Sequence, residues 1–276
     1  MRKMEMAEIQ KISLEIMRQV DEICEKENLR YYLFYGTLIG AIRHHGFIPW
    51  DDDLDIMMPR EDHDRLCRYL IEHQSEYPNL RVFNPSVCPE YPYMITRISD
   101  DRYLIETDDE EEYGMGVFID IYPFDGLGNS KSEAVRFGKM GDRLSSFCFQ
   151  ATRKHIDFKI RTENKSKVRQ LLKVPVWCVS RAIGKDFFQK KLASLAYQKG
   201  FDTSKYVGCV VWLSGGERDM YKRKWLDDYI KVPFEQYQFR VPKHYDRILR
   251  QTYGDYMQLP PENERIGHHF YYVHEK

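Results

Sequence analysis

The chain carries a conspicuous run of carboxylates, Asp51-Asp52-Asp53-Leu54-Asp55, set between apolar residues. In an extended segment side chains alternate between two faces, so Asp51, Asp53 and Asp55 would project from the same face. Neighbouring positions on one face lie about 6.5–7 Å apart, and carboxylates this close repel one another unless a cation or protons compensate. Such an all-oxygen site suits Mg²⁺ or Mn²⁺ that also binds phosphate oxygens. We therefore expect a divalent metal site here, with Asp52 facing solvent or supporting the ligands from behind.

Two other interpretations of the acidic run are a solvated loop and the start of an EF-hand calcium loop. Trp50 before the acids, and Leu54 and Ile56 among and after them, favour a segment packed against a core over a solvated loop. An EF-hand needs glycine at its sixth position and glutamate at its twelfth, where this chain has Ile56 and Asp62. The EF-hand interpretation is therefore excluded.

Upstream of the acids, Gly36-Thr37 precedes a short helical pattern over residues 38–43. Backbone N–H groups at the start of a helix can hold phosphate, and glycine permits close approach. A glycine turn, a short helix and a strand with alternate acids form the general arrangement of the nucleotidyltransferase superfamily, in which Gly36-Thr37 would be the phosphate turn. Arg43 could steady the same phosphates with its guanidinium fork, unless it is a surface cation of the helix. His44 and His45 are better explained as polar loop residues.

A third acidic position follows in the apolar pattern Phe118-Ile119-Asp120-Ile121. A buried lone carboxylate is costly without a partner, and a metal or the proton of an acceptor would explain it. The alternative is a surface-facing residue on a half-exposed strand. Asp125 is the second candidate for this third carboxylate.

The elements that position these residues follow from apolar periodicity. Ile9, Ile12, Ile16, Val20 and Ile23 recur at three- and four-residue intervals, which predicts an amphipathic helix ending near residues 27–28. Strand patterns occupy residues 31–35, 54–58, 81–83, 93–98, 103–106, 117–122 and 207–213, with a helix over 60–72 and a turn over 126–130. Residues 131–199 are largely helical in pattern and basic.

These elements predict an α+β fold, with a mixed sheet flanked by helices and an additional mainly helical region. We expect a nucleotidyltransferase-like catalytic core over residues 1–130, the helical region over 131–205, and a C-terminal segment over 206–276 that completes the active site.

The bulk composition narrows the classes of partner. With 276 residues, 42% of them hydrophobic, the chain can bury a substantial core, and its formal net charge of -1 disfavours nucleic acid as a partner. The six cysteines show no CxxC or zinc-type spacing, which indicates reduced and mostly buried thiols. We expect a cytoplasmic protein, since neither a signal-peptide pattern nor an apolar run of about 18 residues is found.

Residues 35–56, which include Tyr35-Gly36-Thr37 and the whole acidic run, closely resemble the first motif of the LicD family. The segment Phe118-Ile119-Asp120-Ile121-Tyr122-Pro123 is similar to the middle motif of that family. A C-terminal match comprises Tyr253-Gly254-Asp255-Tyr256-Met257, Leu259-Pro260-Pro261-Glu262, Arg265 and His268-His269. Together the matches extend from about residue 31 to residue 269, and residues 131–199 carry none of them.

The resemblance implies a LicD-type phosphotransferase, similar in its core to nucleotidyltransferases and to the eukaryotic fukutin group. Typical bacterial members pass phosphocholine from CDP-choline to a sugar of a teichoic acid, capsule or lipopolysaccharide. The related eukaryotic proteins share acids at the positions that match Asp51, Asp53 and Asp55. The implied partners are a CDP-linked donor and a glycan or lipid-linked glycan acceptor; the choline itself is implied by the resemblance alone.

On this basis Asp53 and Asp55, with Asp51, are expected to hold the metal, and Asp120 to ligate it or to take the proton of the acceptor. The C-terminal Arg265 and His268 are expected to close over the nucleotide or the acceptor. Aromatic faces would hold a quaternary ammonium group, although the sequence does not place them.

Three alternatives remain open at the level of sequence. The chain could be a nucleotidyltransferase acting on a small hydroxyl compound, or could transfer phosphoethanolamine, glycerol phosphate or ribitol phosphate. A non-catalytic binding protein is disfavoured because all three acids of the run are present. The basic residues 165–191 could rest on the inner face of the membrane if the acceptor is lipid-linked, although packing on the core is the simpler interpretation.

Overall fold

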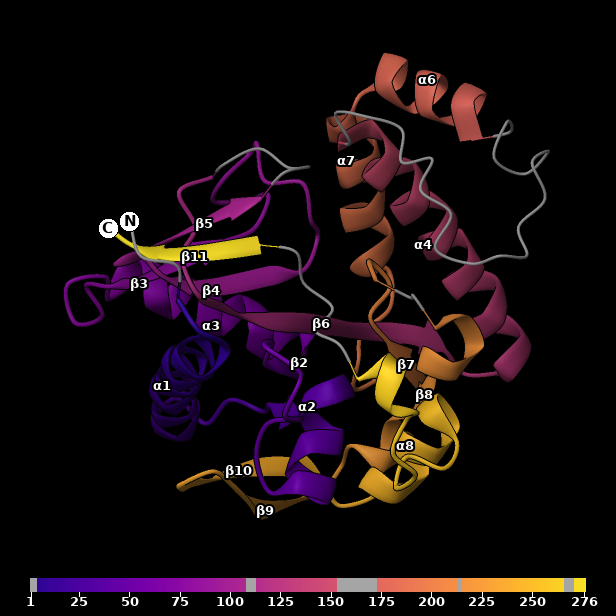
Figure 1. The fold of residues 1–276 in the computed structure, drawn as a ribbon. Coiled ribbons are helices and arrows are strands. Elements are labelled where there is room, and N and C mark those ends of the chain that lie inside the picture. Colours follow the sequence, from indigo (N-terminus) through magenta and orange to yellow (C-terminus); the bar gives the residue numbers. More distant parts are fainter. Residues whose placement is uncertain (1–3, 108–112, 153–172, 213–214, 266–270) are drawn as a thin grey trace.

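The computed structural model describes residues 4–107, 113–152, 173–212, 215–265 and 271–276, and Figure 1 shows the course of the chain. The described α-helices are α1 Met6–Lys26, α2 Tyr35–Ile39, α3 Arg60–Glu72, α4 Lys131–Thr152, α6 Lys173–Ile183, α7 Lys185–Ala196 and α8 Tyr245–Tyr253. The described strands are β1 Tyr32–Leu33, β2 Asp55–Pro59, β3 Leu80–Phe83, β4 Thr96–Asp100, β5 Tyr103–Thr107, β6 Phe118–Gly128, β7 Tyr206–Gly208, β8 Tyr221–Lys222, β9 Tyr229–Phe234, β10 Tyr237–Pro242 and β11 Tyr271–Glu275. A π-helical turn, Gly40–His44, continues α2.

The centre of the described chain is a seven-stranded mixed sheet of order β1-β2-β6-β4-β3; β7 also pairs with β6, and β8 pairs with β7. Strands β2 and β6 are parallel and place Asp55 directly opposite Asp120. The strands β1, β4, β3 and β7 join antiparallel to their neighbours. The predicted α+β class, with a mixed sheet flanked by helices, is thereby confirmed.

The N-terminal helix packs on this sheet. Helix α1 begins at a capping box, in which the carboxylate of Glu8 accepts the backbone N–H of Glu5. Its apolar side chains Ile16, Val20 and Ile23 are almost fully buried, and the helix lies against β4 and β6. Burial of each of them contributes about 1.5–3 kcal/mol to folding. The helix expected from the isoleucine spacing is confirmed.

Strand β6 joins the two halves of the molecule. It is buried along its whole length; its first half lies between β2 and β4, and its second half pairs with β7 and packs on α4. In Figure 1 this strand runs from the sheet of β2 and β4 toward α4 and β7, and the three helices α4, α6 and α7 lie together on that half of the molecule. The largely helical pattern expected after residue 131 is seen in these three helices.

Two expected boundaries were wrong. The turn expected over residues 126–130 begins later, because β6 continues through a register irregularity to Gly128. The strand expected over 207–213 ends at Gly208, because the carbonyl of Val211 accepts a hydrogen bond from Ser145 of α4 at 2.9 Å instead of pairing in a sheet. The division of the chain at residues 130 and 205 stays a prediction.

All six cysteines are free thiols, as expected; four are buried, Cys88 is half-buried and Cys178 is exposed. Within the ranges given above, no helix combines the length and apolarity needed to span a bilayer.

Candidate active site

The acidic run lies at a cavity of about 620 Å³ that is built from both ends of the chain. The N-terminal half contributes residues of α2 and of the π-helical turn, the acids, and Tyr122 of β6. The C-terminal half contributes α8 and the segment that follows it, from Tyr253 to Glu264. Segments some two hundred residues apart along the chain therefore meet at the carboxylates.

The backbone of the acidic run is extended only at its end. Residues 51–54 have no regular secondary structure, and β2 begins at Asp55. Asp51, Asp53 and Asp55 nevertheless all line the cavity, while Leu54 and Ile56 are fully buried in the core. The expected alternation of sides is confirmed, although a strand supplies it only from Asp55 onward.

Of the two alternatives for Asp52, the solvent-facing one was wrong, and a role in supporting the ligands from behind stays a prediction. This carboxylate is only 8% exposed and does not line the cavity. The alternation turns Asp52 away from the other acids, but in this fold the opposite side of the segment is covered by protein and not by water.

Asp55 is the electrostatic centre of the cavity. Its carboxylate is buried, and its Oδ1 atom has no hydrogen-bond partner among the residues that the structure describes. Burial, together with the nearby carboxylates of Asp53, Asp120 and Asp51, raises the pKa of Asp55 well above its usual range. A hydrogen bond from the Tyr122 hydroxyl opposes this rise only in part. An ionised Asp55 therefore needs a positive charge that the described side chains do not supply to it directly.

The divalent cation expected at these acids stays a prediction. In the described part of the chain, no three His, Cys, Asp or Glu side chains are placed to hold a metal ion by themselves. Mg²⁺ does not require such a set, because it is usually held by one or two carboxylates together with water and substrate phosphates. The orphaned Oδ1 of Asp55 and the mutual repulsion of four acids are the features that such a cation would relieve.

Asp120 is held beneath the cavity by a buried arginine. The Nε atom of Arg97 donates to Asp120 Oδ1 at 2.8 Å, and the guanidinium lies over the rings of Phe118 and Tyr93, at 4.0 and 4.9 Å from their centres. Although burial alone would lower it, the pKa of Arg97 is raised well above its ordinary value by Asp120. Asp120 is thus a buried strand residue and not the surface-facing residue that was the alternative. Arg97 was missed, because nothing in the sequence pairs it with Asp120.

Replacing Arg97 by methionine is expected to destabilise the protein by about 3 kcal/mol, because Asp120 would remain buried without its partner. Chemical denaturation would measure this loss of unfolding free energy. Arg81→Met is the matched control: Arg81 of the neighbouring strand β3 pairs with Asp101, but both side chains are partly exposed, 39% and 29%, so its loss should cost less than about 1 kcal/mol. Equal effects of the two substitutions would contradict the structural importance assigned to the buried pair.

Asp125, the alternative third carboxylate, lies elsewhere. It is buried and bound by Arg60 at 2.8 and 3.0 Å, and it does not line the cavity. The interpretation of Asp125 as the third acid was wrong, because β6 carries it past the end of β2 to the side of α3.

Gly36 and Thr37 lie beside the acids in different ways. Gly36 lines the cavity, and a Cβ atom there would lie 3.0 Å from Asp51 Oδ2, so a larger residue would push on that carboxylate. Thr37 is buried, and its hydroxyl accepts the backbone N–H of Asp55 at 2.7 Å. The structure thus places the Thr37 side chain outside the cavity lining, where it ties α2 to the start of β2.

Arg43 joins the acidic half of the cavity to the C-terminal segment. Its guanidinium lines the cavity and donates to the carbonyls of Tyr256 at 2.7 Å and Gln258 at 3.4 Å. Arg265 lies behind the wall, where it donates to the Pro260 carbonyl at 2.9 Å and lies 5.7 Å from the ring centre of Trp50. Arg43 is therefore a cavity residue and not a surface cation, whereas Arg265 supports the segment that lines the cavity. His268 lies outside the described residues.

Replacing Arg43 by alanine is expected to raise the KM for an anionic donor about 10- to 100-fold, because a charged hydrogen-bond donor contributes about 1.5–3 kcal/mol. Steady-state kinetics over a range of donor concentrations would show it. Arg43→Lys keeps the charge but not the two-carbonyl contact, so it should recover only part of the affinity. An unchanged KM in both variants would remove Arg43 from the binding site.

The cavity is also rich in aromatic side chains that the sequence did not single out. Six of them line it, from segments scattered along the chain: Tyr35, Trp50, Tyr122, Trp212, Tyr253 and Tyr256. Burial and the carboxylates of Asp55, Asp219, Asp53 and Asp51 raise the pKa of Tyr253, which places its hydroxyl close to the acids. Two features of the sequence could have indicated aromatic residues at this cavity. Trp50 directly precedes the acids, and Tyr253 and Tyr256 belong to the C-terminal motif.

Comparison with known proteins agrees with this geometry. A family model described as "LicD/FKTN/FKRP, nucleotidyltransferase domain" matches residues 28–150, which include the acids and Asp120. The chain is 31% identical over 270 residues to the lipopolysaccharide cholinephosphotransferase LicD of Haemophilus influenzae, covering 98% of this chain and 97% of that protein. An uncharacterized protein of Rickettsia typhi is 29% identical over 171 residues, which are 55% of this chain and 53% of that protein. Human ribitol 5-phosphate transferase FKRP is 44% identical over 48 residues, only 17% of this chain and 10% of that protein.

Proposed function

Because the chain belongs to the LicD family of transferases, we propose that it moves phosphocholine from CDP-choline to a sugar hydroxyl of a cell-surface glycopolymer and releases CMP. The relative that matches over nearly its whole length is a lipopolysaccharide cholinephosphotransferase. Lipopolysaccharide, teichoic acid and capsule are the acceptor classes that fit this proposal. The observation that carries it is one cavity that is lined both by a carboxylate cluster and by six aromatic side chains.

The two kinds of lining residue suit the two charged parts of such a donor. The carboxylates can hold Mg²⁺ or Mn²⁺ against a diphosphate, whereas aromatic faces attract a quaternary ammonium group by about 0.5–2 kcal/mol for each ring. The cavity volume of about 620 Å³ lies within the range of small-molecule sites. A donor with an anionic middle and a cationic, methylated end therefore fits the lining better than a plain nucleotide does.

In this proposal Asp53 and Asp55, with Asp51 and Asp120, would hold a divalent cation, and a bound cation would supply positive charge against the diphosphate and the departing CMP. The bond to Arg97 occupies Oδ1 of Asp120 and orients that carboxylate beside Asp55. Gly36 leaves room beside Asp51 for a phosphate. Arg43 binds phosphate oxygens while it keeps the C-terminal segment in place.

The acceptor hydroxyl must lose a proton as it attacks phosphorus. Asp120 does not line the cavity, which makes it a poor receiver of that proton. We assign the proton to Asp51, a half-buried carboxylate at the cavity beside Gly36. The rest of the rate enhancement comes from positioning and electrostatics, as in phosphoryl transfer generally.

A panel of donors tests the proposal. The protein is incubated with CDP-choline, CDP-ethanolamine, CDP-glycerol and CDP-ribitol, each with Mg²⁺ and a choline-free glycan acceptor, and CMP release is measured. CDP-choline is expected to give the fastest release. A preference for CDP-ribitol would point to the activity named for the FKRP relative, and release of pyrophosphate from a nucleoside triphosphate would identify a nucleotidyltransferase instead.

A further inference from the structure

A second cavity lies on the other side of α3 and shares no lining residue with the acidic one. It has a volume of about 660 Å³ and lies between α3, the segment from Asn84 to Thr96, and α7. The side chains of Cys67, His63, Asn84 and Thr96 all line it. A thiol and an imidazole therefore meet at a cavity that the proposed transfer reaction does not use.

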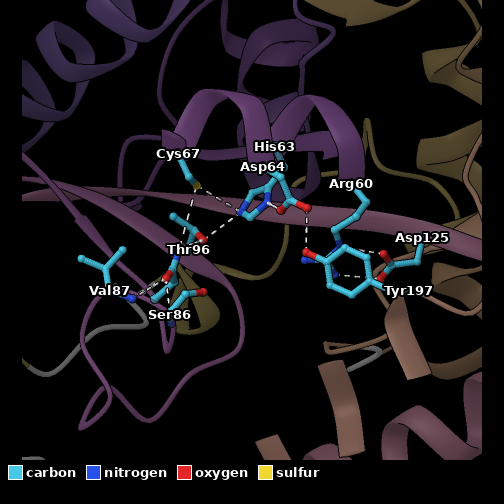
Figure 2. A network of polar contacts seen from close by, with 10 residues as sticks. Arg60, His63, Asp64, Cys67, Ser86, Val87, Thr96, Asp125 and Tyr197 are labelled. Carbon is cyan, nitrogen blue, oxygen red and sulfur yellow. Dashed lines mark hydrogen bonds and ion pairs between the residues drawn. The ribbon is translucent and has the colours of Figure 1, made fainter. Parts of the chain in front are cut away.

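The imidazole of His63 is oriented toward the thiol. His63 and Cys67 are one helical turn apart on α3, and His63 Nε2 lies 3.7 Å from Cys67 Sγ and 2.8 Å from Thr96 Oγ1. The other ring nitrogen, Nδ1, lies 2.8 Å from Asp64 Oδ1. Since a carboxylate only accepts, Nδ1 carries a proton and Nε2 is left to take the proton of the thiol or the hydroxyl. Figure 2 shows the ring of His63 between the carboxylate of Asp64 and the sulfur of Cys67.

Asn84 adds a donor on the sulfur side. Its Oδ1 accepts the backbone N–H groups of Ser86 and Val87 at 3.0 and 3.1 Å, which fixes the orientation of the amide. Its Nδ2 then points to Thr96 Oγ1 at 3.2 Å and to Cys67 Sγ at 3.9 Å. The sulfur of Cys67 therefore has two polar neighbours, the amide of Asn84 and the imidazole of His63.

The groups around this pair hold it in place. The hydroxyl of Tyr197, the residue that follows α7, donates to Asp64 Oδ2 at 2.6 Å. The guanidinium of Arg60 lies 5.2 Å from the centre of the Tyr197 ring and also pairs with Asp125 of β6. Figure 2 shows Arg60, Asp125 and Tyr197 together at one end of this network. Asp186 and Lys190 of α7 also line the cavity, with opposite charges. Burial and Arg60 oppose the charge on His63, but Cys67 and Asp64 together raise the pKa of His63 to about 9.

The other thiols lack this environment. Burial raises the pKa of Cys24, Cys148 and Cys209. Cys178 is exposed on α6 and provides an ordinary surface thiol for comparison. Cys67 is 7% exposed, so its contact with solvent is through the cavity.

We propose that Cys67 is a modification site, a reactive thiol that forms a mixed disulfide with a small disulfide of the glutathione class entering this second cavity. His63 Nε2 takes the thiol proton, and the thiolate attacks one sulfur of the disulfide. The new bond joins Cys67 Sγ to that sulfur, while the disulfide bond of the reagent breaks and its other sulfur leaves with the electron pair. That leaving thiolate takes the proton from His63, so one disulfide and one protein thiol give one mixed disulfide and one free thiol.

The test uses oxidised glutathione on the folded full-length protein, with intact mass and peptide mapping to assign the modified cysteine. At pH 6.5 an ordinary thiol is about 1% thiolate. Cys67 is expected to react at least about 10-fold faster than Cys178 at this pH, and the advantage should shrink at pH 8.5. Labelling of Cys178 and Cys88 first, with Cys67 reached only in urea, would overturn the proposal.

Two substitutions separate an activated thiol from one that is merely accessible. His63→Gln and Asp64→Asn should each slow modification of Cys67 about 10-fold at pH 6.5, while the rate at Cys178 in the same sample stays unchanged. Asp64 is partly exposed, so Asp64→Asn leaves the core intact and decides the question if His63→Gln does not fold. Unchanged Cys67 rates in Asp64→Asn would show that His63 is not oriented as a base. The proposal does not rest on the transfer reaction, because the readout is the modified cysteine.

Discussion

Asp55→Asn is expected to lower transfer at least about a thousandfold, equivalent to about 4 kcal/mol, and to stabilise the metal-free protein at the same time. Activity falls while stability rises because both depend on the negative charge of the Asp55 carboxylate. Asp55 is buried among the carboxylates of Asp53, Asp120 and Asp51, and its Oδ1 has no partner among the described residues. An amide removes the repulsion but also removes the ligand. The substitution therefore exchanges activity for stability.

Two measurements on the same preparation test this. CMP release reports activity, and thermal unfolding in EDTA reports the stability of the metal-free protein. Asp52→Asn is the matched control, because Asp52 belongs to the same acidic run and is buried but does not line the cavity. It should keep transfer within about tenfold of the original protein and should not raise the melting temperature as Asp55→Asn does. Near-normal turnover of Asp55→Asn would remove Asp55 from the reaction centre.

Removal of divalent cations is expected to reduce transfer to the background rate and to lower the melting temperature, with the larger loss of stability at higher pH. The pKa of Asp55 in the folded protein lies above its ordinary value of 3.8. Between these two pKa values the folded protein holds a proton that the unfolded chain has released. The metal-free protein therefore loses stability as the pH rises from about 3.8 through the raised pKa. A cation binds the ionised carboxylate and opposes this loss.

Melting curves between pH 5 and pH 8.5, with EDTA or with Mg²⁺ or Mn²⁺, test this expectation. The stabilisation by the cation should grow with pH in the original protein and should be much smaller in Asp55→Asn. Arg81→Met, which changes a charge distant from the cavity, should respond to the cation as the original protein does. A cation effect that is equal at all pH values, or equal in Asp55→Asn, would place the metal elsewhere.

The sequence predicted the acidic residues of the cavity well. Asp51, Asp53 and Asp55 fall on one side because neighbouring residues alternate in an extended backbone, and this holds even where no strand forms. Asp120 was predicted because a lone acid in an apolar strand is costly to bury unless it has a partner. The parallel register of β2 and β6 brings Asp120 opposite Asp55.

Errors arose where a residue's environment depends on what packs over it. One of the two alternatives for Asp52 was that it faces solvent, but alternation says only that it points away from Asp53, and the fold covers that side. The phosphate turn at Gly36-Thr37 stays a prediction, and what the sequence did not predict is that the hydroxyl of Thr37 accepts the N–H of Asp55. Asp125 was a plausible third acid until Arg60 of α3 was seen to bind it.

The sequence by itself indicated which carboxylates gather and to which family their motifs belong, and it predicted a divalent metal for them. These properties reside in residue types at short spacings, where covalent geometry limits the arrangements. Only the tertiary structure decided that Arg97 holds Asp120, that Arg43 binds the segment after α8, and that Asn84 and Thr96 meet His63 and Cys67. These contacts join residues up to 213 positions apart, and packing of the folded chain, which no local pattern encodes, brings them together.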